Sequence, residues 1–449
     1  MKNGLKLIIC LATLLSVQCS VFANAIDKTI SQSEINKAGI SISIKEVGSG
    51  KVIYEQNSQK PTMPASTLKI LTLAASVDTL GKDYKFSTKL YKNTNNELFL
   101  KLGADPFLTS SDLNRIFESA VKNKKILSPK FIYVDDCVFD STEWGEGWQW
   151  DDDLNPLMPK FSSYNIDKNL LNITIAPTNI NAPANIFTSK FYPITFMNLV
   201  TTGNENNISI SRNNSISPDI ITIEGTVKKQ ETEFIPINHP KRYFILRIED
   251  AIRSAKMDYY GKFAQKKVPS TNVYLVAQAD HDLQTAISAI LKNSNNFVAE
   301  TVFKLAGGKY VNNTGSLANS QKMLNNYFDK LSLNYENIKI VDGSGVSKNN
   351  LMTTDFMTEF LSKQEVIDTL KPELPTSGEG TLKNRMLYFK DNLRAKTGTL
   401  SDVSAIAGYI TSRTGRTYAF DIMINDPKSK SNDKKSLEEY ILRDIYTNY

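Results

Sequence analysis

The chain has 449 residues, of which 41% are hydrophobic, so it is long enough for two or three well-packed domains and is neither disordered nor fibrous. Its formal net charge of +6 falls to about +4 without Lys2 and Lys6 of a predicted leader, an excess too small to indicate nucleic-acid binding. Only His239 and His281 could supply imidazole, so a histidine metal site or a Ser-His-Asp triad is disfavoured, and we expect no metal and no cofactor.

The first 25 residues have the features of a secretory signal peptide. Lys2 and Lys6 precede an apolar run from Leu7 to Val17, and Ala23-Asn24-Ala25 supplies small residues for cleavage. The apolar run has about 11 residues, fewer than the roughly 20 that a membrane-spanning helix needs. We therefore expect a cleaved leader and a periplasmic protein, with an uncleaved anchor as the alternative.

The cysteines give little support for other forms of attachment or for disulfides. Cys19 follows Gln18, where a lipoprotein would have a small residue, so a lipid anchor is disfavoured. Removal of the leader leaves Cys137 alone, which excludes an internal disulfide. We interpret Cys137 as an inert, partly buried thiol.

The elements that follow the leader begin with a hairpin and a helix. Residues 39–47 and 51–56 alternate between apolar and polar side chains, which predicts two paired strands. Apolar positions from 65 to 80 have helical spacing, and the segment is entered through Pro64 and stopped by Gly81. This pattern places Ser66 at the start of a helix.

About 200 residues then precede the next motif, which indicates inserted domains. We predict a catalytic domain from residues 26–82 and 236–449, an inserted α/β domain at 83–176 and a small inserted β domain at 177–235. The first insert is predicted to contain strands at 98–102 and 130–134 and a helix at 111–122. The second is predicted to contain short strands such as 208–210 and 220–223 between Asn-rich turns.

The remaining chain mixes helices with strands. Helices are predicted at 243–256, 282–291 and 297–305, and strands at 393–400, 403–411 and 417–425. A last helix at 435–446 is amphipathic. It carries three acidic residues, which favours packing on the sheet over binding to a membrane surface.

Three short motifs occur in one order along the chain. They are Ser66-Thr67-Leu68-Lys69, Ser294-Asn295-Asn296 and Lys396-Thr397-Gly398, the three-part signature of acyl-serine enzymes that process or are inhibited by penicillin. A lone Ser-x-x-Lys is weak evidence, because Ser119 to Lys122 and Ser431 to Lys434 match it as well. We interpret these two as surface pairs.

The first motif supplies a nucleophile and a base. Ser66 and Lys69 are three positions apart on one helix, so their side chains share a face. A serine hydroxyl needs a base to remove its proton, and a lysine can do so only when its pKa is lowered. Lys396 would add a neighbouring positive charge that favours a neutral Lys69 by repulsion.

The other two motifs predict the binding groups. Ser294 would relay a proton to the leaving amine, and Asn296 would bind the substrate carbonyl, although the same residues could form a simple polar loop or helix cap. Thr397 and Thr399 could hold a terminal carboxylate, and Gly398 would let an extended substrate lie along the strand. The N–H groups of Ser66 and Thr399 would face a developing oxyanion.

At this point the sequence resembles the class C low-molecular-mass penicillin-binding proteins, which are D-alanyl-D-alanine carboxypeptidases and endopeptidases with domains inserted after the first motif. The resemblance implies an α/β (α+β) transpeptidase fold of the penicillin-binding and β-lactamase type, with an antiparallel sheet flanked by helices and two inserted smaller domains. It rests on ordered blocks: 64–69 with 80–81, 103–106, 147–150, 293–300, 342–345, 374–375 with 380–382, and 396–398. Three positions depart from the usual family residues, namely Ala104, Asn295 and Lys348.

The resemblance also implies roles for individual residues. It implies an acyl-enzyme on Ser66 with Lys69 as base and Ser294 as relay. An Asp in the segment that matches Trp148-Gln149-Trp150 holds the side-chain amino group of diaminopimelate in related enzymes, and Asp152 aligns best with it. Lys348 would contribute on the opposite side, with weaker geometric definition than an Arg. A packed insert with a solvated acidic loop is the alternative interpretation of the Trp-rich stretch.

Together these patterns predict a periplasmic serine DD-peptidase that acts on peptidoglycan stem peptides and is inhibited by β-lactam antibiotics. A β-lactamase shares the motifs, but the gap of about 228 positions between Ser66 and Ser294 argues against that compact fold. A non-catalytic wall-binding protein of the same fold is the other alternative. The sequence leaves the balance between carboxypeptidase and endopeptidase activity open, and also the oligomeric state.

Overall fold

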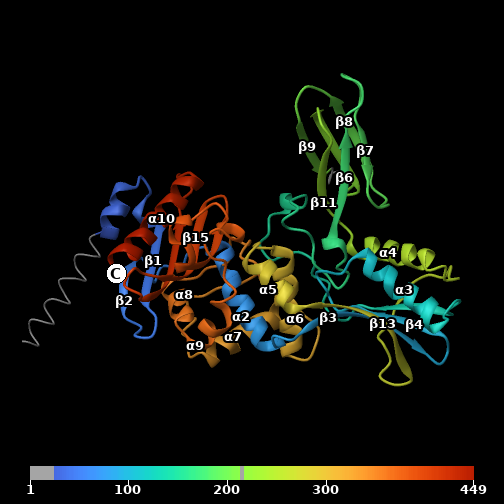
Figure 1. Cartoon of the computed structure of the whole chain (residues 1–449). Helices are drawn as coiled ribbons and strands as arrows, with labels where there is room; N and C mark the ends of the chain where they lie inside the picture. The colour runs from blue at the N-terminus through green and yellow to red at the C-terminus, as the bar shows by residue number, and fades with distance from the viewer. Residues whose placement is uncertain (1–24, 213–216) are drawn as a thin grey trace, which may run out of the picture. The chain divides into compact units, whose positions relative to one another are not determined.

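The computed structural model describes residues 25–212 and 217–449, which form two compact units (Figure 1). The first unit contains the described residues up to Thr79 together with Ala286–Asn295 and Gln321–Tyr449. The second contains Leu80–Thr285 and Asn296–Ser320. The predicted signal peptide lies, except for Ala25, outside the described residues.

An antiparallel sheet of five strands organises the first unit. Its order is β14 (Leu393–Thr399), β15 (Val403–Thr411), β16 (Thr417–Asn425), β1 (Ile40–Glu46) and β2 (Val52–Gln56). The predicted hairpin and the two C-terminal strands are therefore confirmed. Strands β14 and β2 form the edges of the sheet.

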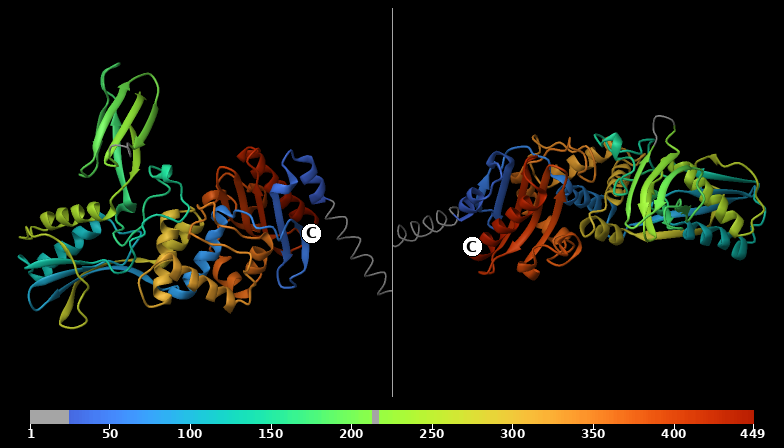
Figure 2. Two further views of the ribbon diagram at one scale, coloured as in Figure 1. Left: turned by 180° about the vertical axis from the view of Figure 1, so that it is seen from behind. Right: turned by 90° about the horizontal axis from the view of Figure 1, so that it is seen from above.

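The last helix, α10 (Ser431–Asn448), covers one face of this sheet (Figures 1 and 2). Leu437, Ile441 and Ile445 of α10 are buried in one cluster with isoleucines of β1, β15 and β16. Burial of this apolar stripe removes the surface that a membrane would contact. The prediction that the helix packs on the sheet is therefore confirmed.

The other face carries α8 (Thr354–Leu361), which packs on β1 and β16, and the turn η2 (Ala65–Leu68), which packs on β14 and β15. Helix α2 (Lys69–Leu80) continues from η2. The predicted helix from 65 to 80 is thus divided at Lys69, because Ala65 has a φ of +48° and the next residues form a 3₁₀ turn. Shorter elements of this unit are η1 (Lys37–Gly39), α9 (Gln364–Leu370), η5 (Gly380–Leu382) and η6 (Leu387–Asn392).

The second unit is built on a mixed sheet with the order β12-β5-β4-β3-β13. The strands are β12 (Ala264–Gln265), β5 (Phe131–Asp135), β4 (Glu97–Lys101), β3 (Lys85–Asn93) and β13 (Val273–Asp282). Helices α3 (Ser110–Lys124) and α4 (Pro240–Ser254) pack together and bury their apolar faces in the core of this sheet. A capping box between Thr109 and Asp112 starts α3.

Two three-stranded sheets complete the second unit. One has the order β8 (Thr195–Thr202), β10 (Ile220–Val227) and β9 (Asn207–Arg212), and the other β11 (Glu231–Pro236), β6 (Leu170–Ala176) and β7 (Asn185–Thr188). Helix α6 (Asn296–Tyr310) also belongs to this unit, and 3₁₀ turns lie at Trp150–Asp152 (η3) and Asp167–Asn169 (η4). Helices α5 (Leu283–Leu291) and α7 (Leu317–Lys330) each begin in the second unit and end in the first, since the limits fall after Thr285 and Ser320.

The limits of these units differ from the predicted domain boundaries. We placed residues from 236 onward in the catalytic domain, yet α4 and β13 complete the core of the second unit. Strand β13 pairs with β3 along nearly its whole length, and Phe244 and Ile248 of α4 are buried in the same core as residues of β13. The apolar pattern of α4 shows that one face is buried, but not which sheet it covers.

Two smaller expectations about burial were wrong. Cys137 is exposed, and partial desolvation together with the Asp135 carboxylate raises the pKa of its thiol, which keeps the thiol protonated and inert. Lys434 is buried, not on the surface, and its Nζ donates to the carbonyl oxygen of Asp402 at 2.8 Å.

A membrane-crossing helix, judged by length and hydropathy, does not occur in residues 25–212 or 217–449.

Candidate active site

Ser66 lies in a turn whose backbone is held by close packing. The preceding residue, Ala65, is buried and has a φ of +48°, a backbone conformation that residues other than glycine rarely adopt. A Cβ atom on Gly345 would overlap the carbonyl oxygen of Ala65, so only glycine fits there. The loop that contains Gly345 therefore supports the turn that presents Ser66.

Lys69 is fully buried and contacts the serine directly. Its Nζ lies 2.8 Å from Ser66 Oγ and 2.6 Å from the carbonyl oxygen of Ser344. The Ser344 loop is held in turn by Asp342, which accepts hydrogen bonds from the N–H groups of Gly345 and Ser347, both at 2.7 Å. This geometry allows Lys69 to take the Ser66 proton.

Lys396 joins the second motif to the third. Its Nζ donates to Ser294 Oγ at 2.8 Å and to the Thr397 carbonyl at 2.6 Å, and its side chain is fully buried. Burial lowers the pKa of Lys396 well below its usual value, and the charge of Lys69 lowers it further. Because this repulsion is mutual, the site disfavours two ammonium groups at the same time.

Strand β14 passes beside the nucleophile. A Cβ atom on Gly398 would lie 2.8 Å from the Ser66 nitrogen, so the absence of a side chain permits this approach. The Thr397 hydroxyl donates to Thr381 Oγ1 at 2.8 Å, while Thr399 is exposed at the end of the strand. The predicted residues Thr397, Gly398 and Thr399 thus line an edge strand next to Ser66.

The turn that carries Ser294 is supported by a segment to which we had assigned no role. Ser294 has a φ of +55°, and the neighbouring Lys292 carbonyl accepts a hydrogen bond from Thr381 N at 3.0 Å. A Cβ atom on Gly380 would overlap the same carbonyl. The family block that contains Gly380 and Thr381 was the sequence signal for this support, as the block at 342–345 was for the Ser344 carbonyl.

Lys348 lies on the surface of the first unit, beyond the loop that Asp342 holds. Its Nζ is 3.4 Å from Asp402 Oδ2, and both side chains are about 40% exposed (43% and 38%). Asp402 follows β14 in the turn to β15. Asp402 was not predicted as a site residue, since nothing in its local pattern separates it from other turn residues.

Two predicted binding residues belong to the second unit. Asn296 is the first residue of α6, and its Nδ2 donates to the Leu157 carbonyl oxygen at 3.0 Å. Asp152 ends the turn η3 and is partly exposed. Within this unit, Asn296 and Asp152 are therefore connected through one short stretch of chain, residues 152–157.

The motif look-alikes have ordinary structural roles. Ser119 Oγ accepts from Asn123 Nδ2 at 3.0 Å on the surface of α3, and Lys122 pairs with Glu118 at 3.1 Å. Arg413-Thr414-Gly415 forms the hairpin turn between β15 and β16, as predicted.

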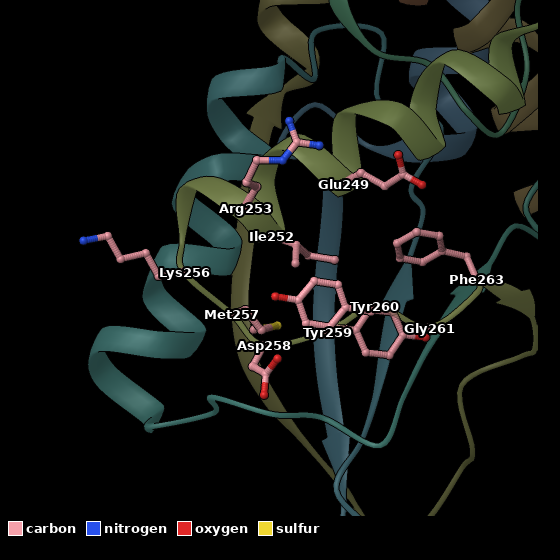
Figure 3. A pocket seen from close by; sticks show the side chains of 10 residues that line it. All are labelled: Glu249, Ile252, Arg253, Lys256, Met257, Asp258, Tyr259, Tyr260, Gly261 and Phe263. Carbon is pink, nitrogen blue, oxygen red and sulfur yellow. The ribbon is translucent and has the colours of Figure 1, made fainter.

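A pocket of about 550 Å³ in the second unit is separate from this chemistry (Figure 3). It is lined by the end of α4 and the following loop, with Ile252, Met257, Tyr259 and Phe263 among its walls. No predicted catalytic or binding residue lines it. Within the part of the chain that the structure describes, no cluster of three or more His, Cys, Asp or Glu side chains could hold a metal ion.

Comparison with family models gives a match over residues 22–443 to the D-Ala-D-Ala carboxypeptidase 3 (S13) family. The chain belongs to this family. The predicted resemblance and the prediction of a serine-type D-Ala-D-Ala carboxypeptidase are therefore confirmed. The match covers both units, including the segments inserted between the first and second motifs.

Individual relatives are distant but similar in length. The carboxypeptidase is 24% identical to the D-alanyl-D-alanine carboxypeptidase DacB of Haemophilus influenzae, over 92% of this chain and 91% of that protein. It is also 24% identical to a D-alanyl-D-alanine carboxypeptidase of an Actinomadura species, over 89% and 80%.

Solved structures show the same fold. The crystal structure of penicillin binding protein 4 from Haemophilus influenzae matches with a TM-score of 0.81 and 23% identity, and covers 94% of this chain and 98% of that one. A structure of the same protein complexed with a β-lactam matches with a TM-score of 0.78. The predicted mixed fold of antiparallel sheets flanked by helices is confirmed.

Proposed function

We propose that this carboxypeptidase is a periplasmic serine DD-peptidase that forms an acyl-enzyme on Ser66 and acts on peptidoglycan stem peptides. The observation that carries the proposal is the 2.8 Å contact between Lys69 Nζ and Ser66 Oγ, inside a site where Lys396 is also buried. A neutral Lys69 accepts the serine proton as Oγ attacks the carbonyl between two D-alanines. Ser294 then passes a proton to the leaving amine.

The edge of β14 is suited to hold the substrate backbone. An extended peptide can add to this edge beside Gly398, with its terminal carboxylate near the hydroxyl groups of Thr397 and Thr399. The carbonyl under attack then lies near the Ser66 N–H, which can stabilise the oxyanion. The same geometry would accept a β-lactam ring in place of the peptide bond, and the similar Haemophilus protein has been crystallised in complex with a β-lactam.

Covalent labelling with a fluorescent penicillin tests the acyl-enzyme. We expect one labelled residue, Ser66, and no labelling of Ser66→Ala. Ser431→Ala is the matched control, because Ser431 opens a look-alike motif on an exposed helix start and should label like the wild type. Labelling of Ser66→Ala at the wild-type rate would refute the proposal.

The alternatives predict different products. A β-lactamase would release hydrolysed penicillin in many turnovers, and a non-catalytic wall-binding protein would bind sacculi without forming an adduct. We expect digestion of isolated sacculi to release D-alanine, cross-link cleavage products or both, identified by mass. Periplasmic location is tested separately by osmotic-shock fractionation of cells that express the full chain.

A further inference from the structure

Helix α6 holds the stretch of chain that contains all three tryptophans. We call residues 138–165 the Trp segment. Asn296, at the start of α6, donates to the Leu157 carbonyl at 3.0 Å, and Thr301 Oγ1 accepts from Asn165 Nδ2 at 3.2 Å. Gly315, after α6, exchanges backbone hydrogen bonds with Val138 and Asp140 at 2.9 and 3.0 Å. These contacts tie the segment to α6 at several points.

A further attachment is made by Lys304, two helical turns beyond Asn296. Its Nζ is 2.6 Å from Asp140 Oδ1 and 2.6 Å from the Thr142 carbonyl oxygen. The ammonium also lies 4.9 Å from the centre of the Phe139 ring and 5.6 Å from that of Phe161. Lys304 therefore contacts both the beginning and the later part of the Trp segment.

The ring contacts continue from Lys304 to the tryptophans. Phe161 packs edge-on against Trp148 with centroids 5.9 Å apart, and Trp148 packs against Trp144 at 5.0 Å. A Cβ atom on Gly145 would overlap the Trp148 ring, so this packing has little room to shift. The turn η3 begins at Trp150 and ends at Asp152.

A lysine is a costly residue at this position. Lys304 is only 4% exposed, and burial lowers the pKa of its ammonium, an effect that Asp140 partly offsets. An apolar side chain of similar length could fill the space without this cost. The ammonium adds directional hydrogen bonds, which fix one carboxylate and one carbonyl group at defined positions.

We propose that Lys304 is a positioning residue that holds the Trp segment in one conformation, and so sets the place of Asp152 for substrate side-chain recognition. The inference rests on the proposed function and on the role that the family resemblance implies for Asp152, which is to bind the side-chain amino group of diaminopimelate. Lys304 itself touches no substrate. It acts through the Trp segment, which it contacts at Phe139, Asp140, Thr142 and Phe161.

The test compares two peptides that end in D-Ala-D-Ala, one with diaminopimelate at the third position and one with alanine there. For Lys304→Met, we expect the ratio of kcat/KM for the two peptides to fall about tenfold, mainly through KM for the diaminopimelate peptide. Lys309→Met is the matched control, since Lys309 is an exposed lysine of the same helix. It should leave the ratio at the wild-type value.

Tryptophan fluorescence provides a second readout that does not depend on activity. Trp144, Trp148 and Trp150 are the only tryptophans of the chain, so the emission reports on the Trp segment alone. We expect acrylamide to quench Lys304→Met about twice as strongly as the wild type at a temperature well below melting. A general loss of stability would not change quenching in the folded protein.

Asp140→Asn weakens the same contact from its half-exposed side and decides the question if Lys304→Met does not fold. It should shift the ratio and the quenching in the same direction. Wild-type values of both readouts in either folded variant would overturn the proposal and leave the DD-peptidase function intact. If the wild type released no D-alanine from either peptide, the proposed function would fail, while the quenching would still test the attachment.

Discussion

Lys396 Nζ lies 2.8 Å from Ser294 Oγ, although the two residues are 102 positions apart in the sequence. A positive charge on Lys69, whose Nζ contacts the Ser66 hydroxyl, lowers the pKa of Lys396 beyond the effect of burial. The three motifs therefore form one electrostatic unit in which a change at any member alters the protons held by the others.

Ser294→Ala should lower kcat/KM for D-alanine release about 100-fold, because the proton relay to the leaving amine is lost. Acylation by penicillin should slow as well, since the lactam nitrogen needs the same proton. Stopped-flow labelling and D-alanine release measure the two effects. A kcat/KM of Ser294→Ala within twofold of the wild-type value would show that Ser294 does not transfer a proton to the leaving amine.

Lys69→Met should raise the pKa of Lys396. The charge of Lys69 lowers that pKa by repulsion, so its removal must act in the opposite direction, while burial keeps the value below the ordinary lysine range. NMR titration of isotope-labelled lysine measures the shift. Lys434→Met removes a buried lysine outside the site and should leave the titration of Lys396 unchanged. A lower pKa in Lys69→Met would contradict the assignment.

Gly345→Ala should slow acylation of Ser66 at least about 100-fold, since the new methyl group collides with the Ala65 carbonyl and displaces the turn. Gly415→Ala is the matched control. Gly415 has a similar positive φ (+84° against +78°) but no atom within 4 Å of its Cβ position. It should lose only about 1–2 kcal/mol of stability and keep its acylation rate. Equal effects of the two changes on acylation would refute the role of Gly345.

Asp421→Asn should stabilise the protein at neutral pH. Asp421 is fully buried in β16, and desolvation, then the Glu438 carboxylate, raises its pKa well above the usual value. A raised folded pKa means that the stability is full below about pH 4 and falls as pH rises towards the folded pKa. We expect the variant to lose this decline and to melt about 2–4 °C higher at pH 7.

Calorimetric melting of both proteins from pH 4 to 8 checks this prediction. Asp391→Asn, at an exposed aspartate of the same unit, should follow the wild-type pH profile. A parallel profile for Asp421→Asn would mean that the carboxyl group is ionised in the folded protein. That result would require a compensating partner for Asp421.

Local patterns predicted much of the fold and the reacting groups. Strands β15 and β16 have the limits expected on either side of the turn at Arg413-Thr414-Gly415, because apolar runs bounded by turn residues are typical of strands. The three-residue spacing of Ser66 and Lys69 already placed the two side chains together. The last helix showed its apolar stripe in the same way.

Other features could not be predicted, since they depend on contacts between distant segments. Asp402 has no distinctive local pattern, and it matters only through the Lys348 ammonium that reaches it. Lys434 appeared to be a surface residue within a charged run, yet folding buries it. An amphipathic helix also does not show which core it joins, so the sequence could not place α4 in the second unit.

The sequence by itself determined which groups can react and in what order they occur: a serine with a lysine three positions on, a second serine and a Lys-Thr-Gly strand. Only the tertiary structure decided that Lys396 meets Ser294, that Gly345 supports Ala65 and that Lys304 holds the Trp segment. The physical reason is the distance along the chain over which each kind of interaction acts. Helical and strand periodicity act between neighbours in the chain, whereas these contacts require the sheet register and the packing of whole elements.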